Sequence, residues 1–163
     1  ELSLQSNLIT GPIPTEIGML SNISKIVLSH NSLTGTIPSG MLSNLRVLYL
    51  DHNRLSKSML HLNNATSSLQ YLNISDNILT SFPFGKNGFK ELETLDLTQN
   101  LIREDIFMVM DGLSSIKNLL LTNNLFYGSI PNTIRSLARM EKLHLDNNRL
   151  IGTIPDDVLS LVR

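Results

Sequence analysis

The sequence contains no cysteine and no tryptophan, and aromatic residues make up only 5% of its 163 residues. Without cysteine there is no thiol nucleophile and no disulfide framework. An excess of one charge sign is also missing, since the formal net charge is -1 and the 13 Lys and Arg residues are scattered. Nucleic acid or an anionic membrane would require a clustered basic face. We therefore predict no nucleic-acid partner.

Long hydrophobic runs are absent as well. No stretch approaches the roughly 18 apolar residues of a membrane-spanning helix, so we predict no membrane contact by this segment. The opening residues ELSLQSN lack the regions of a signal peptide, and the chain begins with Glu1 rather than Met. These features favour a piece of a longer protein.

Motifs for catalysis are missing too. The sequence has no G-x-S-x-G, no phosphate-binding loop ending in GK[ST] and no H-E-x-x-H. The segment GKNG at Gly85 to Gly88 lacks the spacing of a phosphate loop and is better interpreted as a turn. We predict that the chain is not an enzyme and that it has no catalytic residue and no cofactor.

An internal repeat is what the sequence does contain. LHLDNNRLIGTIP at Leu143 to Pro155 repeats the residue types of LLLTNNLFYGSIP at Leu119 to Pro131. A fixed period of this length indicates a solenoid. One Asn marks each of about seven units, which together form a single domain over residues 1–163: Asn7, Asn31, Asn53, Asn77, Asn100, Asn124 and Asn148.

Each unit has a segment x-L-x-L-x, whose alternation predicts a short strand with one buried face. Crossovers of about twenty residues between successive segments are long enough for parallel pairing. Polar residues at the intervening positions place the other face in water. A second apolar set should close over the buried face as short helices or turns: Ile13, Ile17, Leu20, Ile130, Ile134 and Leu137.

The marker Asn has a physical role where the strand turns inward. Backbone groups removed from water there need partners, and an inward carboxamide offers two donors and an acceptor. We expect each Asn to bond to its own loop and to the next one, so that the residues form a stacked ladder.

The pattern LxxLxLxxNxLxGxIP resembles the leucine-rich repeat, and its GxIP extension resembles the plant-type subclass found in receptor-like protein and kinase ectodomains; members also occur in diatoms and slime moulds. GxIP occurs at Gly11, Gly35, Gly128 and Gly152. The resemblance implies an α/β solenoid, a right-handed superhelix with a concave parallel β-sheet and short helices or turns on its convex side. The three middle repeats lack GxIP, so we expect the family's second sheet to be interrupted there.

The ends lack the polar caps that solenoids need. We therefore expect an uncapped piece with uncovered apolar faces at both ends: Leu2, Leu4, Val158, Leu159, Leu161 and Val162.

Specific recognition is expected on the outward strand positions, which fall into three columns across the sheet. Strands about 4.8 Å apart give a surface roughly 30 Å long. Its aspartates and apolar residues favour a protein or peptide ligand with basic and aromatic or aliphatic groups, and the alternative is a generic solvated face. The residues predicted to contact the ligand are Val27, Tyr49, Asp51, His52, Asn73, Asp76, Asp96, Leu120 and His144.

One column places His30, His52 and Asp76 on consecutive strands. These side chains are candidates to share a divalent metal or to form a proton-sensitive cluster. The alternative is that small polar residues and His occur here because the strand is ending.

Three glycosylation sequons begin at Asn22, Asn64 and Asn73. With the GxIP resemblance they favour an extracellular or cell-surface setting, whereas the absence of cysteine favours the cytoplasm. Three functions stay open: a binding module of a receptor-like or secreted recognition protein, an intracellular scaffold, and an inhibitor of a secreted hydrolase.

Overall fold

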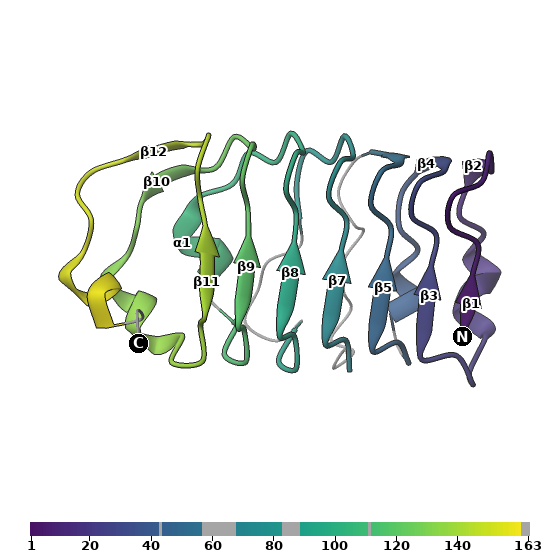
Figure 1. Cartoon of the computed structure of the whole chain (residues 1–163), viewed down its shortest axis with the longest axis horizontal. Coiled ribbons are helices and arrows are strands. Elements are labelled where there is room, and N and C mark those ends of the chain that lie inside the picture. Colours follow the sequence, from purple (N-terminus) through teal and green to yellow (C-terminus); the bar gives the residue numbers. More distant parts are fainter. Residues whose placement is uncertain (43, 57–67, 83–88, 111, 161–163) are drawn as a thin grey trace.

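A computed structural model describes residues 1–42, 44–56, 68–82, 89–110 and 112–160. Within this part, parallel strands form one sheet in which sequence order and spatial order agree (Figure 1). The seven strands are β1 (Leu2–Ser3), β3 (Lys25–Val27), β5 (Val47–Tyr49), β7 (Tyr71–Asn73), β8 (Thr94–Asp96), β9 (Asn118–Leu120) and β11 (Lys142–His144). The predicted sheet of about seven parallel strands is confirmed.

The alternation of each strand decides which of its faces is buried. In β3, β5, β7, β8 and β9 the middle residue is buried and its two neighbours are half-buried. Leu48, Leu72, Leu95 and Leu119 have no exposed surface. These residues join one continuous hydrophobic core behind the sheet. Complete burial of each of these leucine side chains stabilises the fold by about 1.5–3 kcal/mol.

The asparagine ladder is present, and Asn77 shows its geometry. The Oδ1 of Asn77 accepts the N–H of Leu55 at 2.9 Å. Its Nδ2 donates to Leu50 O of the preceding repeat and to Ile74 O and Ser75 O of its own loop, at 3.0, 3.2 and 3.0 Å. From the second repeat on, the neighbour that each Asn reaches is the preceding repeat and not the next one. The buried members of the ladder are Asn53, Asn77, Asn100 and Asn124.

The residue before each marker Asn bends the chain out of the strand. In all seven repeats this residue has a positive φ, between 51° and 61°. Asn, Asp and His tolerate this left-handed conformation better than most residues other than Gly. The prediction that polar residues and His occur here because the strand ends is thus explained by backbone sterics. The residues are Ser6, His30, His52, Asp76, Gln99, Asn123 and Asn147.

A second layer of strands follows the ladder and is split into two parts. One part consists of β2 (Thr10–Pro12), β4 (Ser32–Gly35) and β6 (Arg54–Leu55), and the other of β10 (Tyr127–Ser129) and β12 (Arg149–Ile151). Isolated bridges at Ser56 to Ile78 and at Asp105 to Tyr127 stand where the sheet is broken. The predicted interruption is confirmed among the described residues. It begins one repeat later than expected, because β6 still pairs with β4 although its repeat lacks GxIP.

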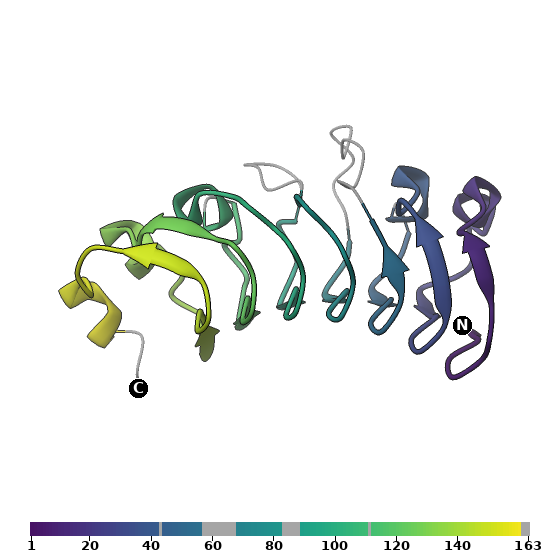
Figure 2. The same cartoon turned by 90° about the horizontal axis from the view of Figure 1, so that it is seen from above.

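Five short helices lie on the side opposite the main sheet in the described part of the chain: η1 (Thr15–Met19), η2 (Ser39–Leu42), α1 (Ile106–Met110), η3 (Asn132–Ser136) and η4 (Asp156–Ser160). Figure 2 shows that the molecule bends into an arc with these helices on its outer side. Extended Pro14 and Pro131 precede η1 and η3, which agrees with the fixed φ of proline. In the described part of the chain, no helix has the length and hydrophobicity to cross a membrane.

The second apolar set covers the core as expected, with one exception. Ile13, Ile134 and Leu137 are buried, and Ile17 and Ile130 pack against the core while partly exposed. Leu20 is 44% exposed, so its predicted burial is wrong. It follows η1 in a non-helical conformation that ends the helix.

At the two ends, exposure of the predicted apolar residues is partial. Leu4 is 39% exposed, whereas Leu2 and Val158 pack partly against the core. The side chain of Leu159, together with Leu161 and Val162, lies outside the described residues.

Candidate binding surface on the concave sheet

The main sheet lines the inner side of the arc (Figures 1 and 2). The strand register aligns the predicted central column residue by residue. Its inner members are half-buried and His144 is exposed, so all of them are accessible from the concave side. The column is Ser3, Val27, Tyr49, Asn73, Asp96, Leu120 and His144.

The next column, two residues after the central one along each strand, is less accessible than the sequence predicts. Ser29, Asp51 and Ser75 are buried, with 6%, 8% and 6% of their surface exposed. Asp51, a predicted ligand-contact residue, is thus far less accessible than the residues of the central column. Two histidine side chains lie against its carboxylate: His52 Nδ1 is 3.2 Å and His30 Nε2 is 3.8 Å from Asp51 Oδ2. Both rings therefore help to shield Asp51 from solvent.

A further column, two residues before the central one, was not predicted as part of the surface. It contains Tyr71, whose ring packs against that of Tyr49 with centroids 4.8 Å apart and planes tilted by 33°. The sequence repeat is enough to place this column on the surface, because a residue two positions before an outward strand residue points to the same face. The column is Lys25, Val47, Tyr71, Thr94, Asn118 and Lys142.

The tyrosine pair lies in a negatively charged part of the surface. Partial burial raises the pKa of Tyr71 from 10.0 to about 12, and a hydrogen bond with Tyr49 and the charges of Tyr49, Asp96 and Asp51 add to the rise. A negative field disfavours the phenolate. The same field would attract a cationic ligand group.

Tyr71 therefore predicts a dependence of stability on alkaline pH. A pKa raised on folding means that neutral Tyr71 stabilises the fold fully below pH 10.0, and that this contribution is lost as the pH rises through about 12. We expect the free energy of unfolding to fall more steeply over this range in the native protein than in Tyr71→Phe. Urea unfolding at several pH values, with ultraviolet detection of phenolate, measures the difference. Equal slopes for the two proteins would contradict it.

Two lysines near this surface are paired with carboxylates. Lys25 Nζ lies 3.0 Å from Glu1 Oε1 at the edge of the sheet. Lys117 Nζ, in the loop before β9, lies 2.8 Å from Glu93 Oε2.

Asp96 and Asn73 each accept a backbone N–H two residues ahead, from Thr98 at 2.9 Å and from Ser75 at 3.0 Å. These bonds hold both side chains in place on the surface.

The histidine column contains a cluster that differs from the predicted one. The rings of His30 and His52 stack with centroids 4.1 Å apart. The structure brings them together with Asp51, and nitrogen and oxygen atoms of the three residues lie within 4.8 Å of one another. Asp76 approaches only His52, with 3.6 Å between its Oδ2 and His52 Nε2. Asp51 therefore takes the place in the cluster that was predicted for Asp76.

The sequons lie in different surroundings. Asn22 is exposed in the connection before β3, and Asn73 is half-buried on the concave face. Asn64 lies outside the described residues. Glycosylation at these positions stays a prediction.

Comparisons with known proteins agree with this architecture. The family description "Leucine Rich Repeat" matches residues 22–43, 44–64 and 139–161, and "Leucine Rich repeats (2 copies)" matches residues 67–113. Among curated proteins no sequence matches the chain.

Solved structures of plant receptors are similar over nearly the whole chain. The plant peptide hormone receptor RGFR1, solved with RGF2, is 31% identical with a TM-score of 0.89, and the match covers 99% of this chain and 26% of the receptor. The Arabidopsis receptor kinase HAESA, solved with the peptide hormone IDA and the co-receptor SERK1, is 30% identical with a TM-score of 0.88, covering 98% and 27%.

A shorter Arabidopsis ectodomain, that of the receptor kinase SOBIR1, is 29% identical with a TM-score of 0.60, covering 94% of this chain and 72% of that one. This chain thus spans about a quarter of the length of the first two receptor chains. The repeat spacing, the asparagine ladder, the parallel sheet and these matches agree, and the chain belongs to the leucine-rich-repeat family, with plant receptor ectodomains as its structural neighbours.

Proposed function

We propose that this chain is a non-enzymatic recognition module, part of a receptor-like or secreted protein, that binds a peptide or protein segment on its concave sheet. The observation that supports this most directly is the Tyr49 and Tyr71 pair, half-buried on adjacent strands beside Asn73 and Asp96. Two structural neighbours were solved with peptide hormones. An extracellular or cell-surface setting belongs to the same proposal, supported by those neighbours and the exposed Asn22 sequon.

The surface indicates what the ligand would contain. Tyrosine rings offer large contact area at low entropic cost, and they are frequent anchors of binding energy. Asp96 adds a carboxylate within the field that acts on Tyr71. An extended segment of about nine residues would span the roughly 30 Å of the sheet. We therefore expect a ligand that places a Lys or Arg at Asp96 and an aromatic or aliphatic side chain on the tyrosine pair.

The test is selection from a displayed library of random dodecapeptides, followed by calorimetry with the selected peptides. We expect enrichment of basic residues next to aromatic or aliphatic ones. Tyr71→Ala should weaken binding by about thirtyfold, the effect of losing about 2 kcal/mol at an interface anchor. Asp96→Asn should weaken it by about tenfold and reduce its dependence on salt.

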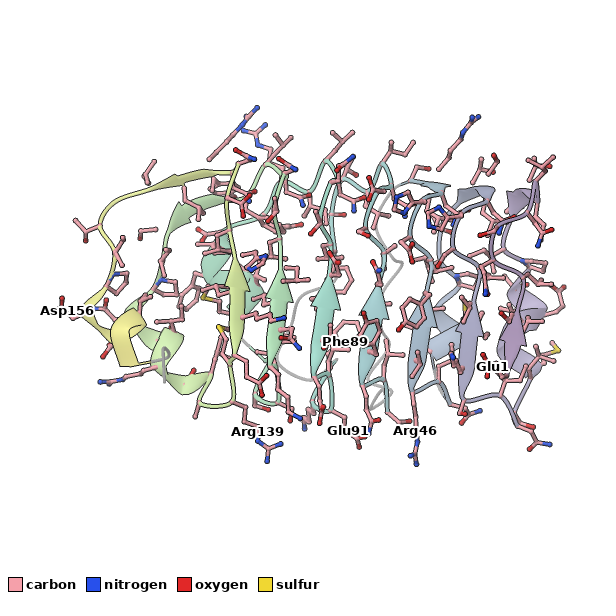
Figure 3. All side chains as sticks on the ribbon, in the orientation of Figure 1. Glu1, Arg46, Phe89, Glu91, Arg139 and Asp156 are labelled. Carbon is pink, nitrogen blue, oxygen red and sulfur yellow. The ribbon has the colours of Figure 1, made fainter. Side chains whose placement is uncertain are left out.

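Asp156→Asn is the matched control, because it removes the same charge from η4, at the opposite end of the molecule from Glu1 (Figure 3). It should leave the affinity unchanged. Selected peptides that bind Tyr71→Ala and the native protein equally would contradict the proposal. If only a folded protein bound this face, at sites insensitive to Tyr71, the intracellular scaffold would be favoured instead.

A further inference from the structure

Two histidines and a carboxylate converge at the rim of the concave face, at the ends of β3 and β5. Asp51 Oδ2 lies 3.2 Å from His52 Nδ1 and 3.8 Å from His30 Nε2. Ligand atoms around a tetrahedral zinc ion, at bond lengths of about 2.0–2.2 Å, are separated by roughly 3.3 Å. The contact with His52 is close to this separation, the contact with His30 is about half an ångström longer, and ligand atoms of all three residues lie within 4.8 Å of one another.

We infer that His30, His52 and Asp51 form a binding site for a divalent transition-metal ion of the Zn²⁺, Ni²⁺ or Cu²⁺ class. Imidazole nitrogen with one carboxylate oxygen is a donor set that suits these metals better than Ca²⁺ or Mg²⁺, which prefer oxygen alone. This inference is carried by contacts other than those of the Tyr49 and Tyr71 pair, so it can be tested without a peptide ligand.

Neighbouring groups already orient the three ligands. The Ser29 hydroxyl donates to Asp51 Oδ1 at 2.6 Å, which leaves Oδ2 facing the histidines. Asp51 is 8% exposed, so its carboxylate is held in one orientation by the surrounding side chains. A buried, hydrogen-bonded carboxylate is the kind of preoriented ligand that favours metal binding.

Asp76 acts on the other side of His52. Its Oδ2 lies 3.6 Å from His52 Nε2. With a metal bound at Nδ1, the proton of the ring would sit on Nε2, where the nearby Asp76 carboxylate stabilises it. Asp76 is thus a positioning residue, and the metal replaces the contact between His52 Nδ1 and Asp51 Oδ2.

The side of the site formed by the two histidines faces solvent. The side chains of His30 and His52 are 54% and 49% exposed, so their rings have room to tilt from the stacked arrangement toward a common ion. The three protein ligands leave at least one coordination position of a four-coordinate ion facing solvent. Water or a carboxylate or imidazole of another molecule would complete the coordination.

The test uses the protein without a polyhistidine tag, titrated with ZnCl₂ by calorimetry and followed by NMR of the histidine rings. We expect one ion per chain, with shifts of the His30 and His52 signals and none for His144. His52→Ala should abolish this binding. Ser29→Ala and Asp76→Asn should weaken it by about 10–100-fold, the usual effect of removing groups that orient metal ligands.

A matched control exists in the same column, in the last two repeats. Thr122 Oγ1 donates to Asp146 Oδ1 at 2.7 Å, as Ser29 does to Asp51, but Asn123 and Asn147 stand where the cluster has histidines. Asp146→Asn should therefore leave zinc binding unchanged. Absence of binding in the native protein, or equal binding by folded His52→Ala, would overturn the inference; circular dichroism of each variant establishes that it is folded.

Discussion

Replacing Asn100 by alanine is expected to lower the free energy of unfolding by at least about 3 kcal/mol. The Asn100 carboxamide accepts the N–H of Leu79 at 3.0 Å and donates to Ile74 O and Leu97 O at 3.0 and 3.1 Å. Its side chain is buried, so water cannot replace it without opening the loop. Each unpaired buried group costs about 1–3 kcal/mol. Urea denaturation monitored by circular dichroism measures the loss.

Asn7→Ala is the control for the position in the repeat. Asn7 makes the bonds to its own loop, to Leu4 O at 3.0 Å and Gln5 O at 3.1 Å, but it is exposed. Water can take over these bonds, so we expect a loss below about 0.5 kcal/mol, as for other surface substitutions. Similar losses for the two variants would show that bonding between repeats is not what gives the ladder its stabilising effect.

Replacing Phe89 by alanine is expected to cost about 3–5 kcal/mol, the range for removing a buried aromatic ring. Phe89 is 1% exposed and stacks on Phe82 with ring centroids 5.4 Å apart. Both belong to a middle repeat without GxIP, where aromatic rings fill core volume that Ile and Leu of the regular repeats fill elsewhere. The cavity left by Phe89 would remove contacts from Phe82 as well.

Phe107→Ala is the matched control on α1, because the same ring is removed from a position that is 48% exposed. We expect a loss of about 1 kcal/mol or less, measured by urea denaturation under the same conditions. Equal midpoints for the two variants would mean that the ring pair packs loosely, contrary to its burial.

The repeat period was sufficient to predict the sheet. Every second strand residue points inward and each turn carries one Asn, so only one alignment of neighbouring strands satisfies both patterns. The alignment of Tyr49 with Asn73 and of Asn73 with Asp96 follows from counting residues alone. The split of the second sheet also followed from the sequence, except that β6 still pairs in a repeat without GxIP. The Gly of GxIP has a positive φ, as at Gly11 and Gly128. Other residues adopt that conformation at a cost.

Residue spacing does not predict which side chains become buried or which ones contact each other. Asp51 occupies a column that looks solvated in the sequence, yet the rings of His30 and His52 cover it. Spacing is enough to place Tyr71 on the outward face, but its ring contact with Tyr49 depends on the orientation of the two rings. Leu20 was assigned to the core from its spacing, but the chain leaves η1 in a direction that exposes it.

The sequence by itself determined the repeat, the parallel sheet, the asparagine ladder and the columns in which the surface residues fall, because these depend on periodicity and on backbone hydrogen bonding. Only the tertiary structure decided which side chains in those columns meet. Side-chain direction at a left-handed bend, and burial by a neighbour more than twenty residues away, depend on how adjacent turns stack. For that reason Asp51 lies close to both His30 and His52, whereas Asp76 contacts the opposite nitrogen of the His52 ring.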